Sequence, residues 1–174
     1  MKITFYLAAL IFYGCGTHLP SSASRIQIGQ KKIRQWCASR MMRATGKNIN
    51  IEKGASFSRK CSLGDNSGIG INCTIHGDVT IGRNVMMGPN VSIYTRNHCI
   101  ERIDIPMNKQ GATKERPVII CDDVWIGCNV VILPGVVVGS HSVIGAGAVV
   151  SKNIPEYAIV VGNPAKIIKS RIKS

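Results

Sequence analysis

The sequence predicts an all-β protein whose chain coils into a parallel β-helix, with a helical segment before the coil and a short helix after it. Two periodic features carry this prediction. A branched or bulky apolar residue recurs at every sixth position, and a small or β-branched residue follows it four positions later. A repeat of this length describes short strands joined by tight turns, with the recurring apolar side chain inside a narrow core. The recurring residues are Ile51, Phe57, Leu63, Ile69, Ile75, Ile81, Met87 and Ile93, and then, in a second register, Ile120, Ile126, Ile132, Val138, Ile144 and Val150.

Glycine supports the same interpretation, because it often stands directly after the recurring apolar residue. Glycine gives the backbone the freedom that a sharp corner needs. Each turn of such a coil lacks a core of its own, so its stability comes from stacking on its neighbours. We therefore assign residues 47–157 to the coil, and a chain of 174 residues needs no second domain.

The N-terminal segment, residues 1–46, is predicted to be helical. Residues 1–20 have the outline of a signal peptide, but their apolar stretch is too short to span a bilayer as a helix. We expect a retained segment that either packs on the assembly or lies on a membrane surface, and cleavage is the remaining alternative. Residues 31–45 follow helical spacing with a basic face, and Gly46 is the expected stop. This helix is expected to cover the open end of the coil.

The repeat breaks once, over residues 94–117. A loop of this length inside a compact repeat is usually functional or disordered. It holds a histidine among polar residues, so we expect a functional loop. After the last repeat, residues 158–174 are expected to form an extended stretch and a capping helix. Asn163 as the N-cap and Pro164 at the first helical position predict where that helix begins.

Charge and cysteine content limit the classes of partner. The chain has 22 Lys and Arg against 9 Asp and Glu, a formal net charge of +13, concentrated in residues 1–60 and near the C-terminus. Positive surfaces attract nucleic acid, anionic membranes or polyphosphorylated small molecules. No nucleic-acid-binding motif is present, so nucleic acid is not expected as a partner. The seven cysteines have no C-x-x-C spacing, which argues against a zinc ribbon or a disulfide framework and fits a reducing compartment.

These repeats and the histidine loop resemble the hexapeptide-repeat acyltransferases, in particular the galactoside and maltose O-acetyltransferases and the polysaccharide O-acetyltransferases. The resemblance covers residues 47–169. It implies a left-handed coil, a homotrimer with active sites between subunits, and acetyl-CoA as the acyl donor. The general rule for parallel crossovers would give the opposite hand, so the hand is implied by the resemblance alone.

His98 is the expected catalytic residue. Transfer of an acyl group from a thioester to a hydroxyl needs a base for the hydroxyl proton, and imidazole has suitable basicity near neutral pH. His98 comes directly after the run 94–97. In the family that the chain resembles, the catalytic histidine occupies this position. The alternative is an exposed loop histidine without a role. His18, His76 and His141 are weaker candidates.

The resemblance also implies a donor site. Trp125 would flank the thioester, the backbone N–H of Cys128 would face its carbonyl, and Ala146 would contact the pantetheine arm. Lys166 and Lys169 would meet the phosphates, where positive charge is favourable. Without the resemblance, Trp125 is ordinary surface packing and the two lysines belong to a solvated face. No metal site is expected, because the histidines and cysteines lack a zinc ligand pattern.

The acceptor side is less specified. Asn72 is the nearest counterpart of the asparagine with which galactoside enzymes hold the sugar, although its spacing to His98 requires a shift. Glu52 is the only acidic residue before Asp65, so the N-terminal acid of those enzymes has no counterpart, and lactose-like sugars are not expected.

The sequence thus predicts a cytoplasmic, acetyl-CoA-dependent O-acetyltransferase with a membrane contact through residues 1–20 as an open alternative. It would transfer the acetyl group to a hydroxyl of a sugar or a surface-polysaccharide precursor by direct attack, with His98 as the base. Two other functions stay open. One is an enzyme that acetylates serine or an antibiotic of the chloramphenicol or streptogramin type, and the other is a non-catalytic β-helical scaffold.

Overall fold

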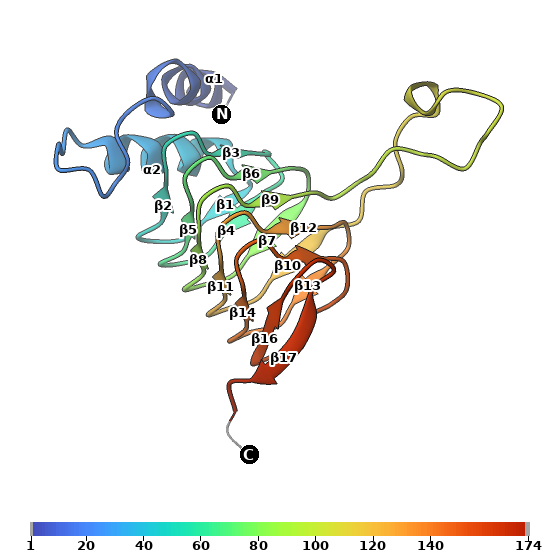
Figure 1. Cartoon of the computed structure of the whole chain (residues 1–174). Coiled ribbons are helices and arrows are strands. Elements are labelled where there is room, and N and C mark those ends of the chain that lie inside the picture. The colour runs from blue at the N-terminus through green and yellow to red at the C-terminus, as the bar shows by residue number, and fades with distance from the viewer. Residues whose placement is uncertain (1, 173–174) are drawn as a thin grey trace.

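The computed structural model describes residues 2–172 and shows a three-sided coil of short parallel strands with helices at its N-terminal end (Figure 1). Sheet 1 contains β1, β4, β7, β10 and β13, and sheet 3 contains β3, β6, β9, β12 and β15. Sheet 2 begins with the pair β2 and β5 and continues with β8, β11, β14, β16 and β17. The predicted parallel β-helix is confirmed. The strands are β1 (Ala44–Thr45), β2 (Asn50–Ile51), β3 (Ser56–Phe57), β4 (Ser62–Leu63), β5 (Gly68–Ile69), β6 (Thr74–Ile75), β7 (Val79–Ile81), β8 (Met86–Met87), β9 (Ser92–Ile93), β10 (Val118–Ile120), β11 (Trp125–Ile126), β12 (Val131–Ile132), β13 (Val137–Val138), β14 (Val143–Ile144), β15 (Val149–Val150), β16 (Ala158–Val161) and β17 (Lys166–Ser170).

The chain visits the three sheets in turn, so each rung of the coil has three corners. The first corner leads from sheet 1 to sheet 2, the second from sheet 2 to sheet 3, and the third from sheet 3 back to sheet 1. Partner strands are one rung apart, as in the pairing of Ser56 with Thr74 and of Thr74 with Ser92. Any one corner therefore brings together residues from successive rungs, which the sequence separates.

The recurring apolar side chains form the core between the three sheets. Ile69, Ile93, Ile126 and their counterparts in the other rungs are almost completely buried. Full burial of one such side chain contributes roughly 1.5–3 kcal/mol relative to exposure. Met87 is the exception, because it is only partly buried.

Helices close the N-terminal end of the coil (Figure 1). Helix α2 (Gln30–Met41) covers the first rung and packs on β2, and α1 (Lys2–Ile11), followed by the π-helical turn η1 (Phe12–Gly16), packs on α2. The predicted end of the second helix at Gly46 is wrong. The helix ends at Met41, because Ala44 and Thr45 pair with β4 as the strand β1.

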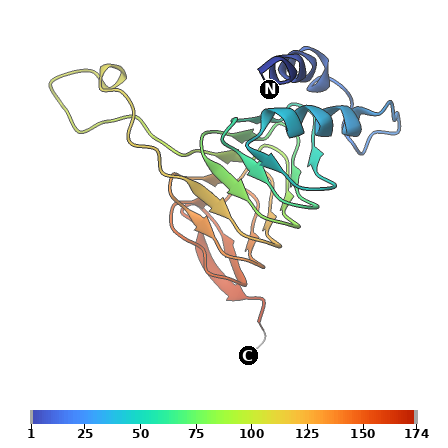
Figure 2. The same cartoon turned by 180° about the vertical axis from the view of Figure 1, so that it is seen from behind.

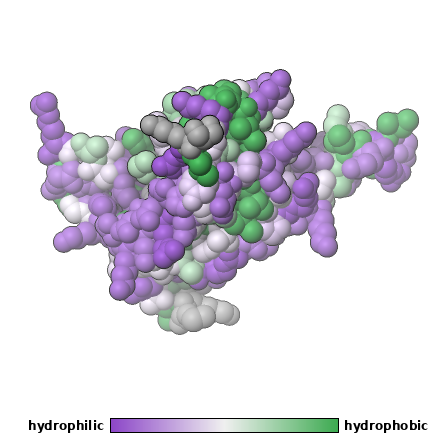
Figure 3. Space-filling view, turned by 90° about the horizontal axis from the view of Figure 1, so that it is seen from below, coloured by the Kyte–Doolittle hydropathy of each residue, from purple (hydrophilic) through white to green (hydrophobic). Residues whose placement is uncertain are grey.

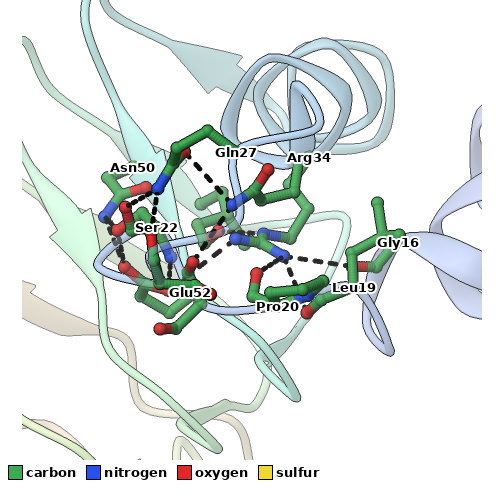
Figure 4. A network of polar contacts seen from close by, with 12 residues as sticks. Gly16, Leu19, Pro20, Ser22, Gln27, Arg34, Asn50 and Glu52 are labelled. Atoms are coloured by element: carbon green, nitrogen blue, oxygen red, sulfur yellow. Dashed lines mark hydrogen bonds and ion pairs between the residues drawn. The ribbon is translucent and has the colours of Figure 1, made fainter.

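A buried arginine fastens these helices to the coil (Figure 4). The side chain of Arg34 is fully buried, donates hydrogen bonds to the carbonyls of Ile51 at 2.6 Å and Pro20 at 3.0 Å, and lies 3.7 Å from the carboxylate of Glu52. Partial burial acts to raise the pKa of Glu52, but hydrogen bonds from Ser22 and Asn50 and the charge of Arg34 lower it below its usual value. The first acidic residue of the chain thus has a structural role.

The C-terminal segment forms a strand where we expected a helix. β16 continues sheet 2 beside β14, and β17 pairs with β16 as an antiparallel strand after a turn that contains the cis peptide bond Asn163–Pro164. The predicted capping helix is therefore wrong. Ile167 and Ile168 are β-branched and favour an extended chain, and β17 covers the edge of β16, which a helix would leave without backbone partners.

Residues 94–117 leave the coil as a long arm, which both views show projecting from one side of the body (Figures 1 and 2). The arm follows β9 in sheet 3 and returns to β10 in sheet 1, so in this rung it takes the place of the third corner. Its tip contains the short 3-10 turn η2 (Met107–Lys109). None of the helices within residues 2–172 is both long and apolar enough to cross a membrane.

Candidate functional site

His98 lies in the part of the arm that is next to the coil. The backbone N–H of Thr113 donates to the carbonyl of Asn97 at 2.8 Å, and His98 forms a β-bridge with Ala112. The two chain segments at the base thus hold each other in place, and the imidazole is exposed. A pocket of about 470 Å³, here called the arm pocket, is lined by Tyr94, Arg96, Asn97, His98 and Ala112 from the arm, by Val131 of sheet 3 and by Leu133, which follows β12.

The second corner carries the residues expected at the thioester. Cys128 and Ala146 stack in successive rungs, where the N–H of Gly147 donates to the carbonyl of Cys128 at 2.8 Å. The approach is close, since a Cβ on Gly127 would lie 2.6 Å from the backbone nitrogen of Ala146. The N–H groups of Cys128 and Ala146 donate to no acceptor within residues 2–172, so this corner offers two open amides to an extended ligand.

The other predicted donor residues lie on sheet 2. Trp125 is 53% exposed on its outer face, and the register places it in one row with Val143, Ile159 and Lys169. Lys166 and Lys169 are exposed on the edge strand β17. A view from the C-terminal side shows hydrophobic surface interrupting a mainly hydrophilic face (Figure 3). The second corner and the outer face of sheet 2 thus contain all five predicted donor residues.

One chain does not bring His98 and this donor region together at a single corner. Cys128 precedes β12, whereas Leu133, which lines the arm pocket with His98, follows it. The width of sheet 3 therefore separates the expected base from the expected donor corner. Asn72 is exposed at the second corner in the left-handed backbone region, with φ of 55°. The third corner, with the arm, and the second corner, with Asn72, are likewise different corners of the same chain.

The third corner contains a polar pocket that the sequence analysis missed. This corner pocket, of about 430 Å³, lies on the N-terminal side of the arm, because Ser58, Lys60, His76 and Gly77 of earlier rungs line it. The rings of His76 and Tyr94 stack in it, with centroids 5.4 Å apart. Glu115 accepts a hydrogen bond from Lys60 at 2.5 Å and lies 3.7 Å from Arg96. The hydrogen bond from Lys60 outweighs desolvation and lowers the pKa of Glu115.

One signal for this pocket was available in the sequence. His76 and Tyr94 stand at the same position of successive rungs, so the repeat itself predicts that their rings can stack. The pairing of Lys60 with Glu115 was not accessible, because it depends on how the arm returns to the coil. The residues that the structure describes contain no group of three or more His, Cys, Asp or Glu side chains placed to hold a metal ion.

The chain matches the family model "Bacterial transferase hexapeptide (six repeats)" over residues 60–95 and 117–152. It is 36% identical to the galactoside O-acetyltransferase of Escherichia coli (strain K12) over 140 residues, which are 78% of this chain and 68% of that enzyme. This chain belongs to the hexapeptide-repeat acetyltransferase family. The predicted family is therefore confirmed.

A solved member of the family has the same fold. A galactoside acetyltransferase in complex with coenzyme A superposes with a TM-score of 0.79 at 30% identity, over 97% of this chain and 81% of that chain. A Schizosaccharomyces pombe protein named as an acetyltransferase is 50% identical over 91 residues, 52% of this chain and 42% of the relative. The chain thus spans less than half the length of that relative.

Proposed function

We propose that this protein is an acetyl-CoA-dependent O-acetyltransferase that acts on a hydroxyl of a sugar or of a surface-polysaccharide precursor. One observation carries the proposal: the arm holds the exposed imidazole of His98 over the outer face of sheet 3, and the corner that precedes this face has open N–H groups at Cys128 and Ala146. The solved galactoside acetyltransferase, which is a complex with coenzyme A, supports the choice of donor.

His98 acts as the general base in this proposal. Its ring takes the proton from the acceptor hydroxyl as the oxygen forms a bond to the thioester carbonyl carbon. The N–H of Cys128 donates to the oxyanion that develops there. The carbon–sulfur bond then breaks, and the imidazolium returns its proton to the sulfur, so that free thiol and an acetyl ester leave. A serine or cysteine nucleophile is not needed, because the hydroxyl attacks directly.

The donor fits the residues of the second corner and sheet 2. Pantetheine is a thin chain with two amides, and the open N–H of Ala146 suits one of its carbonyl groups. The exposed ring of Trp125 offers an apolar wall beside that corner. Lys166 and Lys169 lie on the edge strand of the same sheet, where their charges favour the phosphates of the donor.

The active form in this proposal is a homotrimer in which the arm of one subunit meets the donor corner of the next. The arm exposes three large apolar side chains, Ile100 at 63%, Ile103 at 101% and Met107 at 62%. Exposed apolar groups on a projecting arm favour a protein partner. A second copy supplies such a partner and also the donor corner that the arm does not reach within its own chain.

We place the enzyme in the cytoplasm, where its donor is available, with α1 in contact with a membrane surface. Ile3, Leu7 and Leu10 of α1 are exposed, at 83%, 49% and 72%. Basic residues dominate the neighbouring sequence, and anionic lipid attracts them. Co-sedimentation with anionic vesicles, compared with neutral vesicles, tests this contact.

The decisive experiment for the activity is release of thiol from acetyl-CoA over a panel of sugars, serine and chloramphenicol. The His98→Ala variant should lose about 10²–10⁴-fold in kcat on the preferred acceptor, because it lacks the base. His18→Ala, which removes another exposed histidine, should match the parent. Equal turnover by His98→Ala and the parent would remove His98 from the mechanism. Absence of any turnover or coenzyme binding would favour the scaffold.

A further inference from the structure

Three pockets connect His98 with the N-terminal helices. The arm pocket and the corner pocket share Tyr94 and Arg96 in their linings. The corner pocket shares Lys60 with a third pocket of about 560 Å³, here called the helix pocket, which also includes Tyr6 and Arg59. The pockets therefore follow one another along the third corner, from the imidazole to α1.

The helix pocket combines cations with apolar side chains. Its lining includes Arg40, Arg43, Arg59 and Lys60, and no acidic residue of the described chain lines it. Asp78 lies 2.7 Å from Arg43, and Glu115 lies 2.5 Å from Lys60, so acids outside the pocket balance two of the four charges.

The other two cations are held in place by aromatic rings. The guanidinium of Arg59 lies 4.1 Å from the ring centroid of Phe5, and that of Arg40 lies 5.8 Å from the ring centroid of Trp36. Neither arginine has an acidic partner within residues 2–172. The pocket thus keeps a surplus of two positive charges on guanidinium groups, whose planar forks match phosphate oxygens.

The corner pocket between this cationic site and His98 suits a sugar. The stacked rings of His76 and Tyr94 form a flat wall, and Glu115, Thr95 and Ser58 supply polar groups on the same lining. Concave sites that combine aromatic walls with a few polar groups are typical of small-molecule recognition.

We propose that the helix pocket binds the phosphate group of the acceptor, with the sugar in the corner pocket and its reacting hydroxyl beside His98. This inference rests on the proposed acetyl transfer for the fate of that hydroxyl. A neutral sugar would leave Arg40 and Arg59 without an anionic partner, whereas a sugar phosphate supplies one to both. The apolar side chains of Phe5 and Tyr6, which line the same pocket, would accept an alkyl chain on the phosphate.

Calorimetric titration tests the phosphate site without requiring turnover. Glucose, galactose and N-acetylglucosamine are each compared as the free sugar and as the 1-phosphate, in the presence of coenzyme A. We expect the 1-phosphate of at least one sugar to bind the parent at least about tenfold more tightly than the free sugar, and 0.5 M salt to weaken this preference. Equal affinity within every pair, or no binding of any 1-phosphate, would overturn the proposal.

Variants of the two arginines without an acidic partner within residues 2–172 test whether they cause the preference. Arg40→Gln and Arg59→Gln should each weaken binding of the 1-phosphate about tenfold, which is the size of one charge-assisted phosphate contact. Lys31→Gln removes an exposed cation of the same helix α2 outside the pocket and should bind like the parent. If Arg40→Gln and Arg59→Gln also bind like the parent while their thermal midpoints are unchanged, the pocket is not the phosphate site.

A third measurement distinguishes the two sources of such a phosphate, a lipid-linked sugar and a soluble sugar phosphate. The sugar 1-phosphate is compared with its dodecyl phosphodiester. Tighter binding of the diester, lost in a Tyr6→Ala variant, indicates a lipid-linked acceptor, and equal binding indicates a soluble sugar phosphate. Because binding is measured directly, a failure of acetyl transfer would remove the proposed enzyme activity while leaving a measured phosphate site intact.

Discussion

The first and third corners of the coil occupy equivalent places in every rung, yet they have opposite characters. At the first corner, six residues from successive rungs have φ between 52° and 62°, namely Asn48, Asn66, Asn84, Asp123, His141 and Tyr157. Their side chains interact from rung to rung in two groups of three. Asn48 donates to Asn66 at 3.1 Å, Asn66 donates to Asn84 at 3.3 Å, His141 and Asp123 lie 2.8 Å apart, and the rings of His141 and Tyr157 stack at 4.7 Å.

The third corner shows no such repetition. It holds the stacked rings of His76 and Tyr94, the ion pair between Lys60 and Glu115, and the long arm. Polar side chains at the first corner therefore interact with the residue at the same position one rung away, whereas those at the third corner line pockets. The difference indicates that repetition at one corner stabilises the coil, while departures from repetition at another are free to form a site.

Shortening the arm should have the largest effect, because it removes most of the segment by which the third corner differs from the repeat. Residues 100–110 can be replaced by Asn-Gly, a two-residue turn that suits a hairpin, since the N–H of Cys99 donates to the carbonyl of Gly111 at 3.1 Å. The shortened chain keeps His98. We expect light scattering to show monomers and turnover to fall at least about 100-fold, because the imidazole of a monomer no longer lies beside the donor corner of a neighbouring copy and a misplaced base has that cost. The circular dichroism spectrum should keep its β-sheet form.

Persistence of a fully active trimer without the arm tip would contradict this view of the third corner. A matched control is Ile103→Ser, which removes only the most exposed apolar side chain of the arm. We expect it to weaken the trimer without disrupting the hairpin at the arm base.

A substitution in the first corner should affect stability and leave catalysis unchanged. Asn66→Ala removes two amide hydrogen bonds and places alanine at φ of 57°. We expect a loss of about 1–2 kcal/mol in the free energy of unfolding, measured by urea titration. Asn66→Gly keeps the backbone conformation accessible and should lose less, which separates the backbone cost from the hydrogen bonds. A drop in kcat with unchanged stability would contradict the assigned role.

The smallest effect concerns pH. The hydrogen bond with His141, followed by the charge of Arg171, holds the pKa of Asp123 below its ordinary value despite some desolvation. The unfolded chain then binds more protons, so this contribution is present above the unfolded pKa of about 3.9 and is lost as pH falls through the folded pKa. The stability difference between the parent and Asp123→Asn should therefore shrink below about pH 4. A difference that grows as pH falls would contradict it.

The core was predictable because a six-residue period determines which side of the chain faces inward. Ile69, Ile93 and Ile126 are buried as their spacing predicts. The C-terminal segment was not, since Asn163 and Pro164 are good helix-start residues locally, while the open edge of β16 determines the outcome. The local preference for a helix was overridden by the pairing of β17 with β16, which a short stretch of sequence does not reveal.

The site shows the same limit. His98 could be proposed from the resemblance and from its place after the last repeat before the loop, and Cys128 from the resemblance alone. The burial of Arg34 and the pairing of Lys60 with Glu115 could not, because each depends on the path of a non-repeating segment across the coil. The ladder of Asn48, Asn66 and Asn84 was accessible, because these residues recur once per rung.

Subunit complementation tests most directly whether the arm and the donor corner of neighbouring copies form one site. His98→Ala chains lack the base, and Ala146→Asp chains place a charged side chain at the donor corner, so each homotrimer should be inactive. After the two are mixed, unfolded and refolded together, random assembly joins an intact arm to an intact corner at about a quarter of the sites, so about a quarter of the parent activity should return. Mixed trimers that form without any recovered activity would contradict the account.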